Sequence, residues 1–198
     1  MVRADSNIQT LDDLSGHTVS IGAEESGTER NATQILEFAG MPSSLVATKN
    51  LDYIEATKEL KAGDIDAFFC TAGLTTTVID ELSKECDIRL IPLTDTVISK
   101  MLESSSAYTS EVIPAGTYTG QDTAISTIGV KSVLITKSDV SDDTIEQLTS
   151  LLFEKENELS YSNSLKLELT YDFATDDIPI PFHDGAKRYY KACGYSTN

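Results

Sequence analysis

Short apolar blocks alternate with segments of helical period along the first hundred residues. Residues 17–22 (HTVSIG) are typical of a strand, and residues 27–39 of a helix with Ala32, Ile35 and Leu36 on one face. The same alternation continues, with helices expected over 53–61, 76–85 and 94–104 and strands over 65–70 and 88–93. It predicts an α/β fold with a mainly parallel sheet that is covered by helices on both faces.

The pattern changes after residue 108. Residues 108–127 contain Pro114, Gly116 and Gly120, which predict turns with extended pieces. A long strand is expected over 128–136 (IGVKSVLIT). A strongly amphipathic helix follows from Ser141, and its expected inward side chains are Ile145, Leu148, Leu151 and Leu152. The end of the chain predicts an extended, Pro-rich stretch and then a short helix.

Charge and hydropathy exclude several classes of partner. The 198 residues include 15 basic and 32 acidic side chains, which gives a net charge of −17. Such a surface repels nucleic acid and anionic lipid, so we expect neither as a partner. No apolar run approaches the roughly 20 residues that span a bilayer, and the first residues show no signal-peptide core.

The cysteines and histidines do not predict an enzyme. Cys70, Cys86 and Cys193 are too few and too widely spaced for a disulfide framework or a zinc motif. Cys70 ends a buried-strand pattern, where a cysteine usually acts as a small inert hydrophobe, so a nucleophilic pair with His183 is disfavoured. We therefore predict no catalysis, no cofactor and no metal.

Ligands of parallel α/β sheets bind beyond the carboxyl ends of the strands, which directs attention to two strand-to-helix turns. The first spans residues 22–32 (GAEESGTERNA). Free N–H groups at a helix start bind carboxylate or carbonyl oxygens. The candidate ligand-binding residues here are Ser26, Gly27, Thr28 and Asn31. The alternative is that Ser26 and Glu29 form a capping box and only satisfy the helix end.

The second turn spans residues 70–77 (CTAGLTTT) and again joins a strand to a helix. Its candidates are Thr71, Ala72, Gly73 and Thr75. The alternative is that Thr75 only caps the helix. Because both turns follow strands at the same end of a parallel sheet, we expect them to border one cleft.

A third segment, residues 113–122 (IPAGTYTGQD), is rich in turn formers. Such a loop suits a lid over a pocket, in which Tyr118 would stack on the ligand. The alternative is a purely structural turn.

Five segments in chain order resemble one family of proteins. They are VRADSNIQTLDDLSGHTVSIG, ESGTERNATQIL, LKAGDIDAFFCTAG, IPAGTYTGQD and IPFHDGAKRYYKACG. Together they resemble the TAXI branch of the receptors for tripartite ATP-independent periplasmic (TRAP) transporters. Glu25 stands where that family usually has glycine, and a carboxylate there is expected to disfavour anionic ligands.

The resemblance implies a two-lobed fold of the type II periplasmic-binding-protein kind. Residues 15–126 would form the second ligand-binding lobe, and residues 1–14 and 127–198 would be hinge segments and the C-terminal portion of the first lobe. Family members begin with a secretion signal and the rest of that first lobe, which this sequence does not show. A lobe without its partner strands would leave open edges, so we expect either self-association, most simply as a homodimer, or a mobile C-terminal portion.

The function implied by the resemblance is receptor-type binding. The protein would capture a small organic solute of the amino acid or dicarboxylate class in the periplasm and deliver it to the TRAP membrane permease subunits. The alternative is a ligand-sensing domain of a signalling protein on the same fold.

Overall fold

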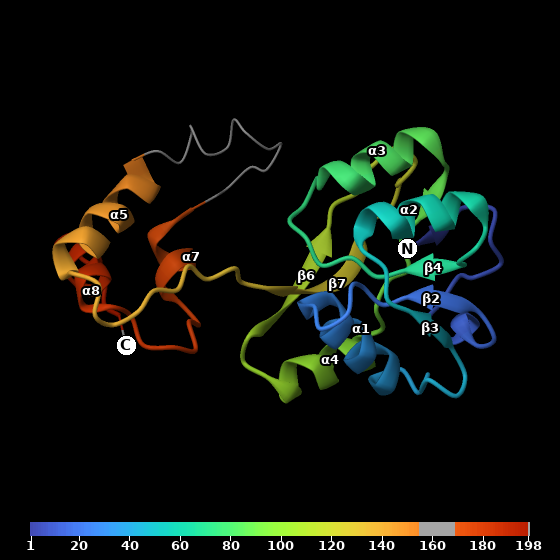
Figure 1. Ribbon diagram of the computed structural model, residues 1–198, viewed down its shortest axis with the longest axis horizontal. Helices are drawn as coiled ribbons and strands as arrows, with labels where there is room; N and C mark the ends of the chain where they lie inside the picture. Colours follow the sequence, from blue (N-terminus) through green and yellow to red (C-terminus); the bar gives the residue numbers. More distant parts are fainter. Residues whose placement is uncertain (155–168, 198) are drawn as a thin grey trace. The chain divides into compact units, whose positions relative to one another are not determined.

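The computed structural model describes residues 1–154 and 169–197, and the chain divides into two compact units. The first unit is Met1–Gly129 and the second is Val130–Asn198. Figure 1 shows the elements of both units along the chain.

The first unit contains a five-stranded sheet in the order β3-β2-β4-β1-β5. β2 pairs in parallel with β3 and β4, whereas β1 pairs antiparallel with β4 and β5. The strands are β1 (Val2–Arg3), β2 (Thr18–Ser20), β3 (Ala47–Lys49), β4 (Ala67–Phe68) and β5 (Ile88–Arg89). The predicted α/β class with a parallel-rich sheet is therefore confirmed, although β1 and β3 were not foreseen.

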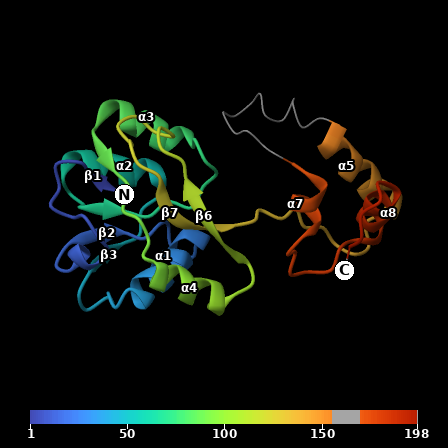
Figure 2. The same cartoon turned by 180° about the vertical axis from the view of Figure 1, so that it is seen from behind.

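Four helices cover this sheet, two on each face (Figure 1), and the view from behind in Figure 2 shows the same layers. α1 and α4 pack on a cluster that contains Val19, Ile35 and Met101, and α2 and α3 pack on a second cluster around Phe68 and Ile79. The helices are α1 (Gly27–Phe38), α2 (Tyr53–Ala62), α3 (Thr77–Glu85) and α4 (Asp95–Ser104). All four were predicted to within one residue at each end.

Local capping explains why these helices begin where they do. The side chains of Ser26, Asp52 and Thr94 accept the N–H groups of residues three positions later, at the starts of α1, α2 and α4. α2 ends at Gly63, whose φ of 81° is the left-handed conformation that glycine adopts without penalty. These signals are local, which is why the sequence pattern located the helices.

The first fourteen residues belong to the first unit, which corrects the expectation that they lie with the hinge and the other lobe. Val2 and Ile8 are buried in the core, and β1 lies between β4 and β5. The guanidinium of Arg89 donates to the carbonyls of Ala4, Ser6 and Ile8 at 2.5–3.1 Å. Buried carbonyls need hydrogen-bond donors, and Arg89 of β5 supplies them. These contacts therefore hold residues 4–8 against β5.

The expected strand over 128–136 is wrong in its bounds. β7 (Ile125–Val130) pairs with β6 (Tyr108–Ile113) and ends at Val130. Residues 131–137 have no strand partner within the described ranges, and Leu134 and Ile135 are 70% and 72% exposed. An apolar β pattern shows which residues suit a strand, but a strand forms only where it can pair with the open edge of another strand.

The described part of the second unit is helical. α5 (Asp142–Glu154) packs on α8 (Asp184–Ala192), with the short α7 (Tyr171–Thr175) between them in sequence. Gly185 is required at the crossing, since a Cβ there would lie 2.2 Å from the carbonyl oxygen of Asp142. The ring of Phe153 on α5 packs against those of Tyr171 on α7 and Tyr189 on α8.

The predicted helix after Ser141 is confirmed, but its inward face was only partly foreseen. Ile145 is buried, whereas Leu148 and Leu151 are 40% and 48% exposed. α8 covers one side of α5, so the outer part of the apolar stripe has no cover among the described residues. Across those same residues, no helix is long and apolar enough to cross a membrane.

The clamp formed by Arg89 generates a stability prediction. We expect Arg89→Leu to lower the free energy of unfolding by about 3 kcal/mol, because three carbonyls lose a charged donor. Arg3→Leu is the matched control, since Arg3 forms a partly exposed pair with Asp5 and should change stability by less than about 1 kcal/mol. Urea denaturation followed by circular dichroism measures both. Equal losses in the two variants would contradict the role of Arg89.

Candidate functional site

The first strand-to-helix turn is closed by its own side chains. Ser26 Oγ accepts the N–H of Glu29 at 3.1 Å, as the capping alternative predicted. The Glu29 carboxylate accepts the N–H of Glu25 at 2.6 Å and the side-chain amide of Asn50 at 2.7 Å. Ser26 and Glu29 are thereby satisfied by the chain itself.

The N–H groups of Gly27 and Thr28 remain available at this helix start. Neither has a hydrogen-bond partner in the part of the chain that the structure describes. They form the first turn of α1, whose dipole favours a negatively charged or carbonyl oxygen. A Cβ atom added at Gly27 would have no other heavy atom within 4 Å, so the space beside this residue is open.

The two turns share one backbone feature. Glu25 and Thr75 adopt φ values of 60° and 57°, and each stands immediately before the N-cap of its helix, Ser26 and Thr76. The left-handed conformation costs a residue with a side chain roughly 1–2 kcal/mol. Strain of this kind is often found at binding sites, although it proves none by itself.

The hydroxyl of Tyr53, at the start of α2, joins the two turns. It lies 2.7 Å from Thr28 Oγ1 and donates to the carbonyl of Thr71 at 2.9 Å. It also accepts the N–H of Thr71 at 3.2 Å. From the sequence, Tyr53 was expected only as the first residue of a helix. A half-buried tyrosine normally finds a partner for its hydroxyl, and this was the missed signal.

Asn31 extends this network along α1. Its amide donates to Thr71 Oγ1 at 3.3 Å, and its carbonyl oxygen accepts the hydroxyl of Tyr108 at 2.9 Å. The structure thus brings the predicted residues Thr28, Asn31 and Thr71 together, with Tyr53 and Tyr108 as additions. We call these five residues the polar cluster. The predicted residues Ala72 and Gly73 follow it on the exposed second turn.

Tyr118 is not on a lid, which corrects the expectation that its ring stacks on a ligand. The residue is 5% exposed and belongs to the core cluster of α2 and α3. Burial raises the pKa of Tyr118, and the backbone N–H groups of Thr76 and Thr75 partly oppose that increase. The ring of Tyr118 is apolar enough to fill part of the core, so this loop contributes to packing and does not form a lid.

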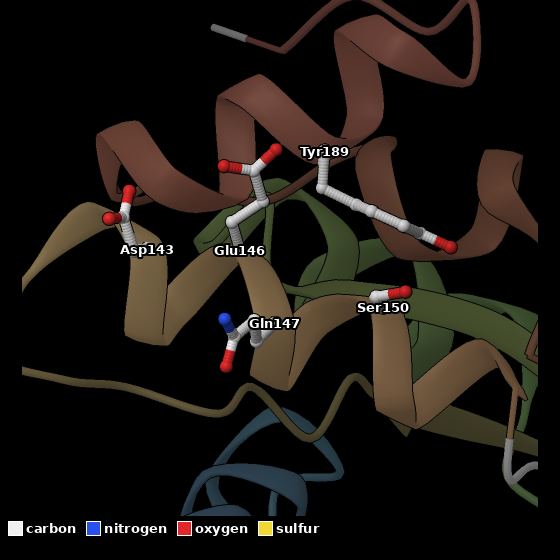
Figure 3. A pocket seen from close by; sticks show the side chains of 5 residues that line it. All are labelled: Asp143, Glu146, Gln147, Ser150 and Tyr189. Atoms are coloured by element: carbon white, nitrogen blue, oxygen red, sulfur yellow. The ribbon is translucent and has the colours of Figure 1, made fainter.

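The surface of the described residues carries shallow hollows, of which two are relevant here. One of about 460 Å³ runs along α1 and is lined by Glu25, Ser26, Glu29, Arg30, Thr33, Gln34 and Glu37. The other, of about 350 Å³, lies in the second unit, where α5 supplies Asp143, Glu146, Gln147 and Ser150 and α8 supplies Tyr189 (Figure 3). Arg188 pairs with Asp143 at 2.9 Å and Glu146 at 3.4 Å, so those carboxylates already have a partner.

Cys70 and His183, the pair considered for catalysis, lie in different units of the described chain. Cys70 is half-buried, and burial raises the pKa of its thiol to about 11. His183 lies in the second unit and accepts the N–H of Gly185 at Nδ1, 3.1 Å away, as the cap of α8. Among the described residues, no group of three or more His, Cys, Asp or Glu side chains is placed to hold a metal ion.

Comparison with known proteins gives two findings. The model of the NMT1-like family matches residues 1–194. The crystal structure of the periplasmic aliphatic sulphonate binding protein SsuA from Escherichia coli is similar at 15% sequence identity and a TM-score of 0.41, over 97% of this chain. This chain covers 60% of that protein's chain.

Removing the Tyr53 hydroxyl should loosen the two turns. We expect Tyr53→Phe to lower the free energy of unfolding by about 2 kcal/mol, because the buried Thr28 hydroxyl and two backbone groups of Thr71 lose their partner. Tyr108→Phe should cost less, since Asn31 and Gln34 are half-exposed and can bind water. Thermal and chemical denaturation compare the two variants. A larger loss for Tyr108→Phe would contradict this account.

The Cys70 thiol should react slowly. With a pKa of about 11, its thiolate fraction at pH 8 is roughly 100-fold below that of an ordinary thiol, and labelling should slow by the same order. The test compares a variant that retains only Cys70 with one that retains only the exposed Cys193. The rate at Cys70 should keep rising with pH towards about 11. Rapid labelling of Cys70 at pH 8 would show that it is not protected.

Proposed function

The chain belongs to the NMT1-like family, and from this we propose that it is part of an extracytoplasmic receptor that captures a small organic solute. The main support is the joining of two strand-to-helix turns by Tyr53, which places hydroxyl and amide groups beside a helix start with free N–H groups. Binding sites of open α/β sheets lie at such turns. The described residues offer donors and acceptors there, but no base beside a nucleophile, so binding suits the arrangement better than catalysis.

The proposed ligand contacts on the first unit come from both turns. The N–H groups of Gly27 and Thr28 would donate to a carboxylate or carbonyl oxygen of the solute. The polar cluster would orient the rest of the solute through hydroxyl and amide groups. The contributing residues are Ser26, Gly27, Thr28 and Asn31 from the first turn and Thr71, Ala72, Gly73 and Thr75 from the second.

The finer identity of the receptor follows the resemblance to the TAXI branch. We propose that the solute is of the amino acid or dicarboxylate class, and that the receptor delivers it to TRAP-type membrane permease subunits from a periplasmic location. The first unit would be the second lobe of a type II binding protein, now including residues 1–14. The second unit would contribute to the other lobe.

Self-association is part of this proposal. Large apolar side chains are exposed in the second unit, including Leu134, Ile135, Leu148 and Leu151. An exposed apolar surface of this kind favours association with another chain. We propose that isolated copies of this chain pair as a two-fold homodimer.

A proline substitution tests the role of the helix start without removing the helix. Gly27 is the first residue of α1, where proline is well tolerated, and Ser26 has the φ of −78° and ψ of 160° that suit a residue before proline. Gly27→Pro removes one N–H donor, so we expect solute affinity to fall about tenfold. Gly27→Ala keeps the N–H and should bind as the unchanged protein does.

The measurement is native mass spectrometry of the full-length protein for a co-purified solute, followed by calorimetric titration of the solute into each variant. Thermal unfolding confirms that Gly27→Pro is folded. No retained solute in the unchanged protein would contradict the receptor function. Equal affinity for Gly27→Pro and Gly27→Ala would show that the solute binds elsewhere.

A further inference from the structure

The two units of the chain are joined between Gly129 and Val130, and the residue on the first-unit side is held in place. Gly129 belongs to β7, which pairs with β6. A Cβ atom added at Gly129 would lie 2.6 Å from Cγ of Glu111 and 3.0 Å from Oγ1 of Thr109, so the side chain of Glu111 passes directly over this glycine. The carboxylate of Glu111 accepts the hydroxyl of Thr109 at 2.9 Å, which keeps it there. The first unit is therefore fixed up to its last residue.

Lys131 stands immediately after the joint and is held by the second unit. Its ammonium donates to the carbonyl of Phe173 at 3.0 Å and to that of Asp176 at 2.7 Å. Both carbonyls lie at the end of α7, where carbonyl groups lack partners inside the helix and where a cation is favoured. The same ammonium lies 4.7 Å from the centre of the Phe173 ring, a distance at which a cation and an aromatic face attract each other. One side chain thus ties the start of the second unit to α7.

Beyond Lys131 the chain is loosely held until α5 begins. Residues 132–139 are exposed. Within the part of the chain that the structure describes, no hydrogen bond joins them to a residue outside 132–140. Ser141 then caps α5, and its Oγ accepts the N–H of Thr144 at 3.3 Å. Among the described residues, Lys131 is therefore the hydrogen-bonded anchor of the chain between β7 and α5.

We propose that Lys131 is a latch that confines the joint between the two units to Val130. With the latch closed, the residues on both sides of Val130 are held by their own units, and the units reorient only through the backbone torsions around it. With the latch open, residues 130–140 become one flexible tether, whose ends would lie roughly 18 Å apart on average. The inference concerns the joint alone and does not depend on the proposed solute binding.

Lys131→Met tests the latch, because methionine keeps an apolar stem and removes the ammonium. Lys137→Met is the matched control, since it makes the same change on the same segment, at an exposed lysine whose ammonium has no hydrogen-bond partner among the described residues. Lys131→Arg keeps a cation with several N–H donors and should restore the latch. Residual dipolar couplings of the backbone amides in the full chain give the degree of alignment of each unit. Unchanged chemical shifts of α5 and α8 show that the second unit is folded.

The alignment of the second unit relative to the first should fall at least about twofold in Lys131→Met, because a longer tether averages the orientations of the two units. It should stay unchanged in Lys137→Met and Lys131→Arg. An unchanged ratio in Lys131→Met would overturn the latch, and so would an equal fall in Lys137→Met. If α7 frays in Lys131→Met while the ratio is unchanged, Lys131 only caps that helix, and the latch is overturned as well.

Discussion

The contact on which the candidate site depends is the hydroxyl of Tyr53. β2 and β4 are parallel neighbours, with Ser20 opposite Phe68, so the turns that follow them emerge at one edge of the sheet. Proximity of the strands alone does not fix the turns, because loops move more than strands do. Tyr53 bonds to Thr28 in one turn and to both backbone groups of Thr71 in the other. Tyr53, with the amide of Asn31 bonded to Thr71 Oγ1, thus sets the spacing of the groups proposed to bind a solute.

The two helix starts at this edge have similar sequences and backbones but different chemistry. Each is preceded by a residue with positive φ, Glu25 or Thr75. At α1 the cap is local and leaves two N–H groups free among the described residues. At α3 the N-cap residue Thr76 makes no side-chain capping bond, and Tyr118 from a distant loop lies in the same core cluster as Ile79 and Leu82 of the helix.

Several carboxylates at the two helix starts have partners within the chain. Glu29 is bound by Asn50 and by the backbone of Glu25, and Arg188 pairs with the acidic start of α5. Such groups are satisfied and offer little to a ligand or a metal. The feature of the second unit that remains unexplained by internal contacts is its exposed apolar surface at Leu134 and Ile135. It is the physical basis for expecting association.

The sequence by itself determined the elements whose causes are local. Periodicity and caps within three residues located four helices of the first unit, and the alternation of elements predicted a parallel-rich sheet. The tertiary structure decided the features that depend on long-range contacts, namely strand pairing and the partners of polar side chains. β1 entered the sheet because Arg89 clamps a segment more than 80 residues away, and the apolar run at 131–137 found no pairing edge in the described ranges. Tyr53 acquired its role, and Tyr118 its place in the core, through partners that adjacent residues do not reveal. Hydroxyl groups carry no periodic signal, so only the folded chain shows which N–H or carbonyl each one meets.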